Sequence, residues 1–380
     1  MRTTIEPFHL SVPEAELEDL RERLTRTRWP ERETVDDWSQ GAPLAKVRAL
    51  CDHWLQGYDW RRCEAKLNGL GQYKTVIDGL GIHFLHIRSP EPDALPMIMT
   101  HGWPGSVIEF MKVIGPLTDP VAHGGKAEDA FHLVLPSLPG YGFSDKPSGP
   151  GWKIERIAAA WVELMQRLGY NRFVAQGGDW GAAVTTALAH LRPPGCKAIH
   201  LNVAVAAPGA DHLADPTPEE KASMADFQRF QSEESAYSML QGTRPQTLGY
   251  GLTDSPAGQA AWIYEKFFAW TDNPGAPEGV LTMDEMLDNI MLYWLPASAA
   301  SSARLYWESI ATAFTPRELD FPTGISIFPR EIVRPSERWA RQYYKDIIYW
   351  NELDRGGHFA AFEQPTLFVD EVRTCFQTIR

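Results

Sequence analysis

The sequence Gly177-Gly178-Asp179-Trp180-Gly181 decides the fold of this chain. It follows residues 172–176, whose apolar pattern predicts a buried strand, and precedes residues 182–191, whose pattern predicts a helix. Glycines on both sides of a central residue fit the sharp strand-to-helix turn that lifts one side chain above a sheet. We therefore expect Asp179 to stand at the carboxyl end of a strand. The alternative is a Gly-rich turn in which Asp179 only caps the helix.

Strand and helix patterns alternate on both sides of this turn. Helices are predicted at residues 107–114, 154–168 and 182–191 and from 365 to the C-terminus. Such β-α-β-α alternation predicts a mostly parallel sheet that binds ligands at the carboxyl ends of its strands. Eight strands are predicted, at residues 73–77, 82–87, 96–100, 131–135, 172–176, 196–203, 324–328 and 347–353.

The alternation stops in one long stretch, residues 210–315, which has helical patterns, many aromatic residues and no convincing strand. We interpret this stretch as a helical lid inserted into the sheet domain. Residues 1–90 form an N-terminal extension of helices and first strands, which we expect to pack on the core and the lid. The core then comprises residues 91–209 and 316–380.

Composition limits the kinds of partner. The chain has 380 residues and a formal net charge of −13 at pH 7, with no basic segment, which argues against binding nucleic acid. No apolar stretch is long enough to span a membrane, and the N-terminus lacks the pattern of a signal peptide. The four cysteines have no C-x-x-C spacing, which favours reduced thiols and a cytoplasmic location.

A carboxylate nucleophile has a specific chemical consequence. When Asp179 attacks a carbon atom it becomes an ester, and water must then cleave that ester. Activation of the water requires a base. His358 follows the last predicted strand, and a sheet fold whose nucleophile stands at such a strand-to-helix turn has its catalytic histidine last in the chain. The alternative is that His358 is a structural histidine.

The histidine in turn needs a carboxylate that fixes its tautomer. Glu331 follows the predicted strand at 324–328 and is the favoured partner. Asp354 is the main rival, although it lies only four residues before His358 on the same loop. A short loop makes a well-aimed contact between neighbours in sequence harder to form.

Ester formation and hydrolysis also need donors for an oxyanion. The backbone N–H groups of Trp103 and Trp180 are the natural donors, because one lies in the early His-Gly loop and the other follows the nucleophile. The rings of both tryptophans are expected to wall the pocket. The alternative for residues 101–105 is a simple turn, which glycine and proline favour in any case.

Four motifs together resemble those of an epoxide hydrolase of the α/β-hydrolase fold. They are His-Gly-Trp-Pro-Gly at 101–105, Gly-Tyr-Gly-Phe-Ser at 140–144, the turn at 177–181 and Arg-Gly-Gly-His-Phe-Ala-Ala-Phe-Glu at 355–363. The segment ending in Thr27-Arg28-Trp29-Pro30 and the segments 244–247 and 254–258 resemble the microsomal-type branch with its extra N-terminal region. The membrane-anchoring helix of animal members has no counterpart here, which places the chain with soluble relatives.

The resemblance implies two lid tyrosines that hold the epoxide oxygen, and the matching residues are Tyr237 and Tyr306. From the residues alone, Tyr250, Tyr264 and Tyr293 stay equally open. The implied reaction converts a small hydrophobic epoxide and water into a vicinal diol through an ester on Asp179. It needs no cofactor and no metal. Detoxification and secondary metabolism are both open as roles, and so is a homodimer.

Two other functions compete with this hypothesis. A haloalkane dehalogenase would use the same aspartate and histidine, but its halide leaves as an anion and needs no tyrosine acid. A binding protein built on the same scaffold would need no catalysis, although such proteins usually lose part of the catalytic set. The tyrosine pair therefore distinguishes an epoxide hydrolase from a haloalkane dehalogenase. The complete set of Asp, His and Glu argues against a binding protein.

Overall fold

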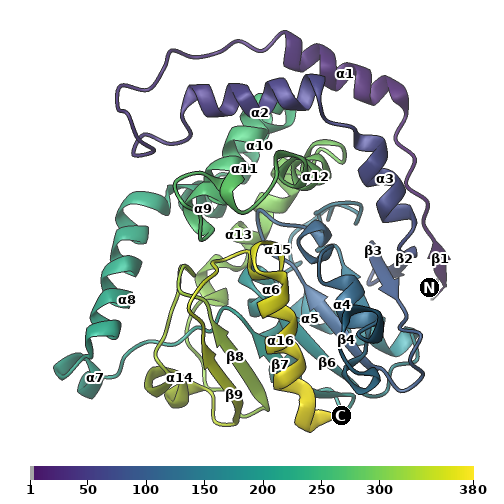
Figure 1. Ribbon diagram of the computed structural model, residues 1–380, viewed down its shortest axis with the longest axis vertical. Helices are drawn as coiled ribbons and strands as arrows, with labels where there is room; N and C mark the ends of the chain where they lie inside the picture. The colour runs from purple at the N-terminus through teal and green to yellow at the C-terminus, as the bar shows by residue number, and fades with distance from the viewer. Residues whose placement is uncertain (1–3) are drawn as a thin grey trace.

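The computed structural model describes residues 4–380 and contains a twisted central sheet with helices packed around it (Figure 1). Among these residues the sheet has nine strands in the order β1-β2-β3-β5-β4-β6-β7-β8-β9. The first three pair in antiparallel fashion and β3 joins β5 in the same way, whereas the pairs from β5 through β9 are parallel. The strands are β1 (Ile5–Pro7), β2 (Gln72–Ile77), β3 (Leu80–Ile87), β4 (Leu95–Thr100), β5 (Phe131–Pro136), β6 (Phe173–Gly177), β7 (Cys196–Leu201), β8 (Thr323–Ile327) and β9 (Ile347–Glu352).

The strand count differs from the eight predicted from the sequence. The additional strand is β1, which pairs with β2 through Ile5 opposite Thr75. A three-residue strand that ends in proline is too short to leave a two-residue alternation in the sequence. Its place at the edge of the sheet suits a proline, which has no N–H to donate.

The helices of the core pack on the sheet through apolar faces. In α5, for example, Ile157, Trp161 and Leu164 recur at helical spacing and are buried. Figure 1 shows α16, in yellow, lying across the near face of the sheet. The core helices are α4 (Ile114–Thr118), α5 (Ile154–Arg167), α6 (Asp179–Leu191), α14 (Glu337–Tyr343), α15 (Ala360–Glu363) and α16 (Pro365–Phe376).

The helix predicted at residues 107–114 is wrong in its length. The chain forms a short 3-10 helix at Val107–Phe110 and then α4 at Ile114–Thr118. The backbone N–H groups of Met111 and Val113 donate to the carbonyl oxygens of Ile108 and Phe110, three residues back instead of the four of a continuous α-helix.

The long stretch between β7 and β8 forms the green helices above the sheet in Figure 1 and the teal helices along its left side. We refer to this region as the lid, and the predicted division of the chain into four parts stays a prediction. Its helices are α7 (Ala210–Ala214), α8 (Pro218–Arg229), α9 (Ala236–Thr243), α10 (Pro245–Asp254), α11 (Pro256–Trp270), α12 (Met283–Trp294) and α13 (Ala299–Ala313), with a π-helical turn at Phe230–Glu234.

The N-terminal segment wraps over the lid. The helices α1 (Glu14–Thr25), α2 (Leu44–Gln56) and α3 (Trp60–Asn68) lie along the outer side of the lid helices α11 and α12 (Figure 1). In the loop between α1 and α2, the Trp38 ring stacks on Phe268 of the lid, with ring centroids 3.8 Å apart and planes 7° apart. The N-terminal segment, which lies between β1 and β2 in the sequence, therefore packs on the outer side of the lid.

A buried carboxylate fastens the lid helix α8 to the core. Glu220 is 2% exposed and accepts hydrogen bonds from Ser336 Oγ at 2.5 Å and Arg338 Nε at 2.6 Å. The Arg338 hydrogen bonds are the main cause that lowers the pKa of Glu220 to about 2. The ionised form of Glu220 therefore stabilises the folded state.

We expect Glu220→Gln to lower the free energy of unfolding at pH 7 by about 1 kcal/mol, a modest value because the Arg338 side chain is 39% exposed. The folded pKa lies below the ordinary value of about 4.3, so this stabilisation is present above that value and is lost as the pH falls towards 2. Denaturation at pH 7 and pH 3 checks the difference. Glu219→Gln, on the exposed side of the same turn, is the control, and an equal loss of stability at both pH values would contradict the argument.

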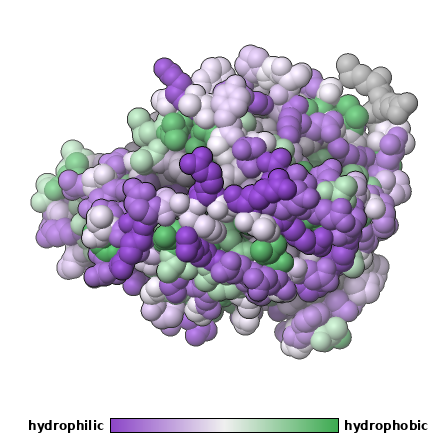
Figure 2. All heavy atoms as spheres, turned by 90° about the horizontal axis from the view of Figure 1, so that it is seen from above, coloured by the Kyte–Doolittle hydropathy of each residue, from purple (hydrophilic) through white to green (hydrophobic). Residues whose placement is uncertain are grey.

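Figure 2 views the molecule from above, onto the N-terminal segment and the lid, and this face is mostly hydrophilic with scattered hydrophobic side chains. Among the helices of residues 4–380, none has the length and apolar character of a membrane-spanning segment.

Candidate active site

Asp179 stands at the turn between β6 and α6. Its φ angle is +49°, in the left-handed region that non-glycine residues rarely adopt and that costs free energy unless the surroundings enforce it. The end of β4 packs closely against the start of α6, because a Cβ atom at Gly181 would collide with the carbonyl oxygen of Thr100. Gly178, and not Asp179, occupies the N-cap position of α6, and no side chain caps this helix. The carboxylate is therefore free to face other groups.

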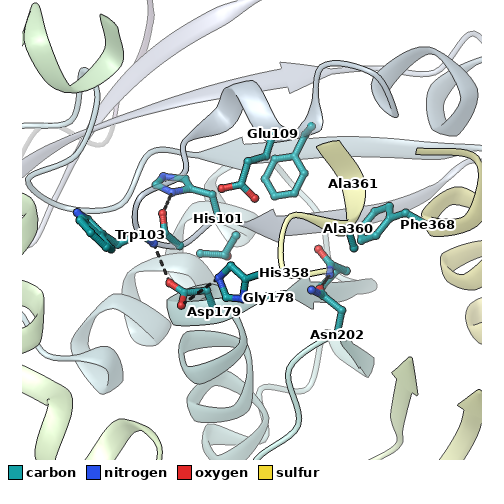
Figure 3. Close-up of a pocket in the computed structure, with 14 residues that line it drawn as sticks. His101, Trp103, Glu109, Gly178, Asp179, Asn202, His358, Ala360, Ala361 and Phe368 are labelled. Carbon is teal, nitrogen blue, oxygen red and sulfur yellow. Dashed lines mark hydrogen bonds and ion pairs between the residues drawn. The ribbon is translucent and has the colours of Figure 1, made fainter. Parts of the chain in front are cut away.

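Two groups converge on the carboxylate of Asp179. The backbone N–H of Trp103 donates a hydrogen bond of 2.7 Å to Oδ1, and His358 Nε2 lies 3.4 Å from Oδ2 (Figure 3). The Asp179 side chain is 15% exposed and that of His358 is 4% exposed. One carboxylate oxygen thus faces the early His-Gly loop and the other faces the C-terminal histidine.

His358 is held from three sides. Its Nδ1 atom lies 2.7 Å from Glu331 Oε1, its backbone N–H donates to the carbonyl oxygen of Trp270 at 2.9 Å, and its ring packs edge-on against the Trp270 ring at 5.0 Å. The contact with Glu331 places the Nδ1 proton towards that carboxylate and leaves Nε2 for Asp179. Further back, Glu363 accepts hydrogen bonds from the backbone N–H groups of Phe359 and Asp272, which fixes the loop that carries His358.

The two carboxylates determine the charge of His358. Burial disfavours the imidazolium ion and would lower the pKa of His358, but Glu331 and Asp179 outweigh burial and raise this pKa well above its usual value. The imidazole is therefore protonated at neutral pH. Loss of the Asp179 charge, as in an ester, removes one of the two causes and lowers the pKa of His358 again.

The two candidate partners of the histidine lie in different surroundings. Glu331 is 4% exposed and contacts Nδ1 directly, whereas Asp354 is an exposed residue of the loop after β9. We expect Glu331→Gln to reduce turnover by about 10²–10⁴-fold, because an amide neither fixes the same tautomer nor stabilises the imidazolium charge.

Asp354→Asn is the matched control and should change turnover by less than about twofold, because exposed charges interact weakly through water. Steady-state rates with one epoxide, measured beside melting curves, check this pair. A larger loss in Asp354→Asn than in Glu331→Gln would reverse the assignment.

Tyr237 in α9 and Tyr306 in α13 lie on the lid side of Asp179. The Tyr237 ring stacks on Trp103 with centroids 5.0 Å apart, and the Tyr306 ring meets the Trp180 ring edge-on at 4.7 Å. The rings of the two tyrosines lie 5.9 Å apart. Burial raises the pKa of Tyr237 and of Tyr306, and the charge of Asp179 raises the pKa of both further. Both phenols therefore carry their protons at neutral pH.

The other lid tyrosines that the sequence left open are placed elsewhere. Tyr250 is 71% exposed on the surface. The hydroxyl of Tyr264 donates to Glu278, and the hydroxyl of Tyr293 donates to the carbonyl oxygen of Gly105 at 2.6 Å. Only the pair that the resemblance indicated lies against the tryptophans beside Asp179.

Trp103 and Trp180 occupy the two positions expected of them. The Trp103 N–H already bonds to the Asp179 carboxylate. Trp180 is the second residue of α6 and is fully buried, and amides in the first turn of a helix have no partner inside the helix. Both rings form walls beside the tyrosines. Their role as oxyanion donors stays a prediction.

Trp270 is one of the many aromatic residues of the predicted lid and the sequence did not single it out, yet it contacts His358 and Trp103. The sequence also did not single out Lys266, which is 2% exposed and whose Nζ lies 4.5 Å from the centroid of the Tyr237 ring. Glu109, which lines a cavity with Asp179 and His358, was likewise missed. An acidic or basic residue within an apolar helical pattern was the available signal, but such a residue usually faces solvent.

Within residues 4–380, no three His, Cys, Asp or Glu side chains are grouped as ligands for a metal ion. The expected independence from any cofactor stays a prediction.

Comparison with known proteins decides the family. Residues 5–110 match the family model described as "Epoxide hydrolase N terminus", and residues 96–249 match the model of the alpha/beta hydrolase fold. The chain is 62% identical to a Stigmatella aurantiaca protein named "Putative epoxide hydrolase", over 99% of this chain and 86% of that protein. The chain belongs to the epoxide hydrolase family.

More distant epoxide hydrolases match over the same length. Epoxide hydrolase 1 of Oryctolagus cuniculus is 36% identical over 97% of this chain and 88% of that protein. The crystal structure of juvenile hormone epoxide hydrolase from Bombyx mori has a TM-score of 0.91 at 32% identity, covering 100% of this chain and 95% of the other. The epoxide hydrolase structure from Aspergillus niger has a TM-score of 0.89 at 30% identity, covering 99% and 97%. The predicted fold class and enzyme class are therefore confirmed.

Proposed function

We propose that this epoxide hydrolase opens its substrate through a covalent ester on Asp179 and then hydrolyses that ester to release a vicinal diol. The observation that carries the proposal is the position of one carboxylate, which receives the Trp103 N–H on one oxygen and faces His358 on the other. A carboxylate in this position can attack carbon in the first step, and the histidine can act as the base in the second step.

In the first step, a carboxylate oxygen of Asp179 bonds to an epoxide carbon, and the bond between that carbon and the ring oxygen breaks. The released oxygen takes a proton from Tyr237 or Tyr306, whose phenols are protonated at neutral pH. Proton donation is essential because an alkoxide is a poor leaving group. The product of this step is a hydroxyalkyl ester.

In the second step, His358 Nε2 takes a proton from water, and the water oxygen bonds to the Asp179 carboxyl carbon. The backbone N–H of Trp103, assisted by that of Trp180, stabilises the oxyanion that forms. The bond between the carboxyl carbon and the ester oxygen then breaks, and the departing diol oxygen takes the proton from the imidazolium. The imidazolium proton that His358 carries before the attack passes to solvent after the ester forms, and the tyrosinate takes one proton back from solvent. After hydrolysis, the proton of the Asp179 carboxylic acid returns to His358, so that the balance is one epoxide and one water consumed for one diol.

The timing of the two steps follows from the pKa of His358. Before the attack, the neighbouring carboxylates raise this pKa, so that the imidazolium stabilises the charge of Asp179. Formation of the ester removes the Asp179 charge and lowers the pKa of His358, which then acts as a base. The aromatic walls of Trp103, Trp180 and Trp270 favour a small hydrophobic epoxide. A cytoplasmic location and a homodimer stay predictions.

The tyrosine pair tests the choice between epoxide and haloalkane. We expect Tyr237→Phe combined with Tyr306→Phe to reduce the rate of ester formation from styrene oxide by at least about 10²-fold, because both proton donors are lost. Tyr250→Phe, on the surface, is the matched control. The measurement is a single-turnover assay with styrene oxide, compared with a 1-haloalkane of similar size. Unchanged turnover of styrene oxide by the double variant would contradict the proposal. Turnover of the haloalkane by the wild type that is faster than that of styrene oxide would contradict it as well.

A further inference from the structure

A small cavity lies behind the Asp179 carboxylate, on the side of His358. Its volume is about 20 Å³, which fits a single water molecule. Besides Asp179 and His358, the polar side chains that line it are Thr100, His101, Glu109, Gln176 and Asn202. Figure 3 labels His101, Glu109 and Asn202 among them. Thus a space of the size of one water adjoins both the atom that an incoming water must attack and the base that must deprotonate it.

The floor of this cavity carries an amide oxygen without a partner. Gln176 at the end of β6 is 1% exposed, and its Nε2 donates to Asn202 Oδ1 at 2.9 Å. Among the described residues, Gln176 Oε1 is buried and has no hydrogen-bond donor. A buried polar atom without a partner costs about 1–3 kcal/mol, which a water molecule in the cavity would offset by donating to it.

Glu109 forms the opposite side of the cavity. It lies in the 3-10 helix Val107–Phe110, directly after the loop that carries Trp103. Glu109 is half-buried, and burial of its carboxyl group, together with the charge of Asp179, raises the pKa of Glu109 to about 8 although His358 acts against the shift. At neutral pH the group therefore carries a proton that it can donate. Figure 3 shows the carboxyl group pointing into the space towards His358 and Asp179.

We propose that this cavity binds the water that hydrolyses the Asp179 ester, and that Glu109 and Gln176 are the residues that position it. This inference rests on the proposed covalent mechanism and adds the source of the nucleophile in its second step. The water donates one hydrogen to His358 Nε2 and the other to Gln176 Oε1, and it accepts a hydrogen bond from Glu109. A lone pair of its oxygen then faces the carboxyl carbon of Asp179. Asn202 holds the Gln176 amide in the required orientation.

The step balances without a further reactant. The water oxygen bonds to the Asp179 carboxyl carbon, and His358 accepts the proton. The ester bond breaks, and the proton on His358 moves to the leaving diol oxygen. Glu109 and Gln176 exchange no proton in this sequence. They therefore affect ester hydrolysis and leave ester formation, which takes place on the lid side of Asp179, unchanged.

The experiment separates the two steps. Styrene oxide is mixed with enzyme in a single turnover, the reaction is quenched at successive times, and intact mass gives the rates at which the adduct forms and decays. We expect Glu109→Leu and Gln176→Met each to slow the decay of the adduct by about 10–100-fold, because misplacement of a reacting group by about 1 Å has effects of this size. Formation of the adduct should stay within about threefold of the wild type.

Glu109→Gln, which keeps a hydrogen-bond donor of the same shape, should restore most of the decay rate. Glu371→Gln is the control for the loss of a buried carboxyl group, because Glu371 is 6% exposed and contacts Ser326 and Asn351, away from the cavity. It should change neither rate. Melting curves of all variants identify any that fails to fold.

The experiment distinguishes failure of the covalent mechanism from failure of the water site alone. If His358→Gln and the wild type never form an adduct, the covalent mechanism itself fails. If the adduct accumulates in His358→Gln but decays at the wild-type rate in both Glu109→Leu and Gln176→Met, only the water site is refuted. A variant that slows formation and decay equally also counts against the water site. If one variant does not fold, the other decides.

Discussion

His358→Gln should convert the enzyme into a trap that forms the Asp179 ester and does not release it. The glutamine retains a polar side chain of similar reach but cannot accept a proton from water, so that ester hydrolysis should slow by about 10²–10⁴-fold. Ester formation should be much less affected, because it depends on the carboxylate and the lid tyrosines. Incubation with styrene oxide should add the mass of one epoxide to the protein, and peptide mapping should place it on the peptide that contains Asp179.

The same incubation with His123→Gln provides the control, because His123 is an exposed residue of a short surface helix and does not line the cavity beside Asp179. That variant should turn over like the wild type and accumulate no adduct. If His358→Gln folds and binds the substrate but its mass does not change, the ester intermediate is excluded. An adduct on any other residue would exclude Asp179 as the nucleophile.

Asp179→Asn should abolish diol formation, with a loss of at least about 10⁴-fold, because an amide is not a nucleophile towards an epoxide carbon. Asparagine suits the test because, like aspartate, it tolerates the positive φ of this turn. The rate of diol formation should be measured together with the intact mass, since deamidation would regenerate aspartate and appear as a gain of about 1 Da. Residual activity that does not follow this deamidation would contradict the prediction.

Oxygen labelling supplies an independent measurement on the unaltered enzyme. In a single turnover in H₂¹⁸O, the ester mechanism transfers an enzyme oxygen to the diol and leaves the label in the Asp179 carboxylate. Direct attack of water on the epoxide would instead label the diol in the first turnover. The two outcomes are exclusive, and mass spectrometry of diol and peptide distinguishes them.

The sequence was most informative where local chemistry is restrictive. Glycines on both sides of Asp179, short apolar strands and the alternation with helices predicted the parallel part of the sheet and the position of the turn. Local patterns did not predict two elements correctly, the first strand and the helix after the His-Gly loop. The three-residue strand β1 (Ile5–Pro7) left no alternation, and residues 107–114 form a short 3-10 helix and the start of α4 in place of the one helix that their apolar spacing predicted.

Candidate site residues showed the same division. Asp179, His358 and Glu331 follow strand ends, and parallel strands bring their carboxyl ends to one edge of a sheet, so that their meeting could be expected from order alone. The choice of Tyr237 and Tyr306 among five lid tyrosines depended on the family resemblance, because helical periodicity does not say which side of a lid faces the sheet. Trp270 and Lys266 were not recognised for the same reason.

By itself the sequence determined the fold, the family and the order of the chemical groups along the chain, because these depend on local turn chemistry and on short motifs. Only the tertiary structure decided that His358 Nδ1 meets Glu331 and that Glu109, Gln176 and Asn202 surround one small cavity. These residues lie on separate elements, and only packing fixes their distances, their burial and hence the proton that Glu109 carries at neutral pH. A hydrolytic site for one water is a property of that packing and has no signature in any single segment.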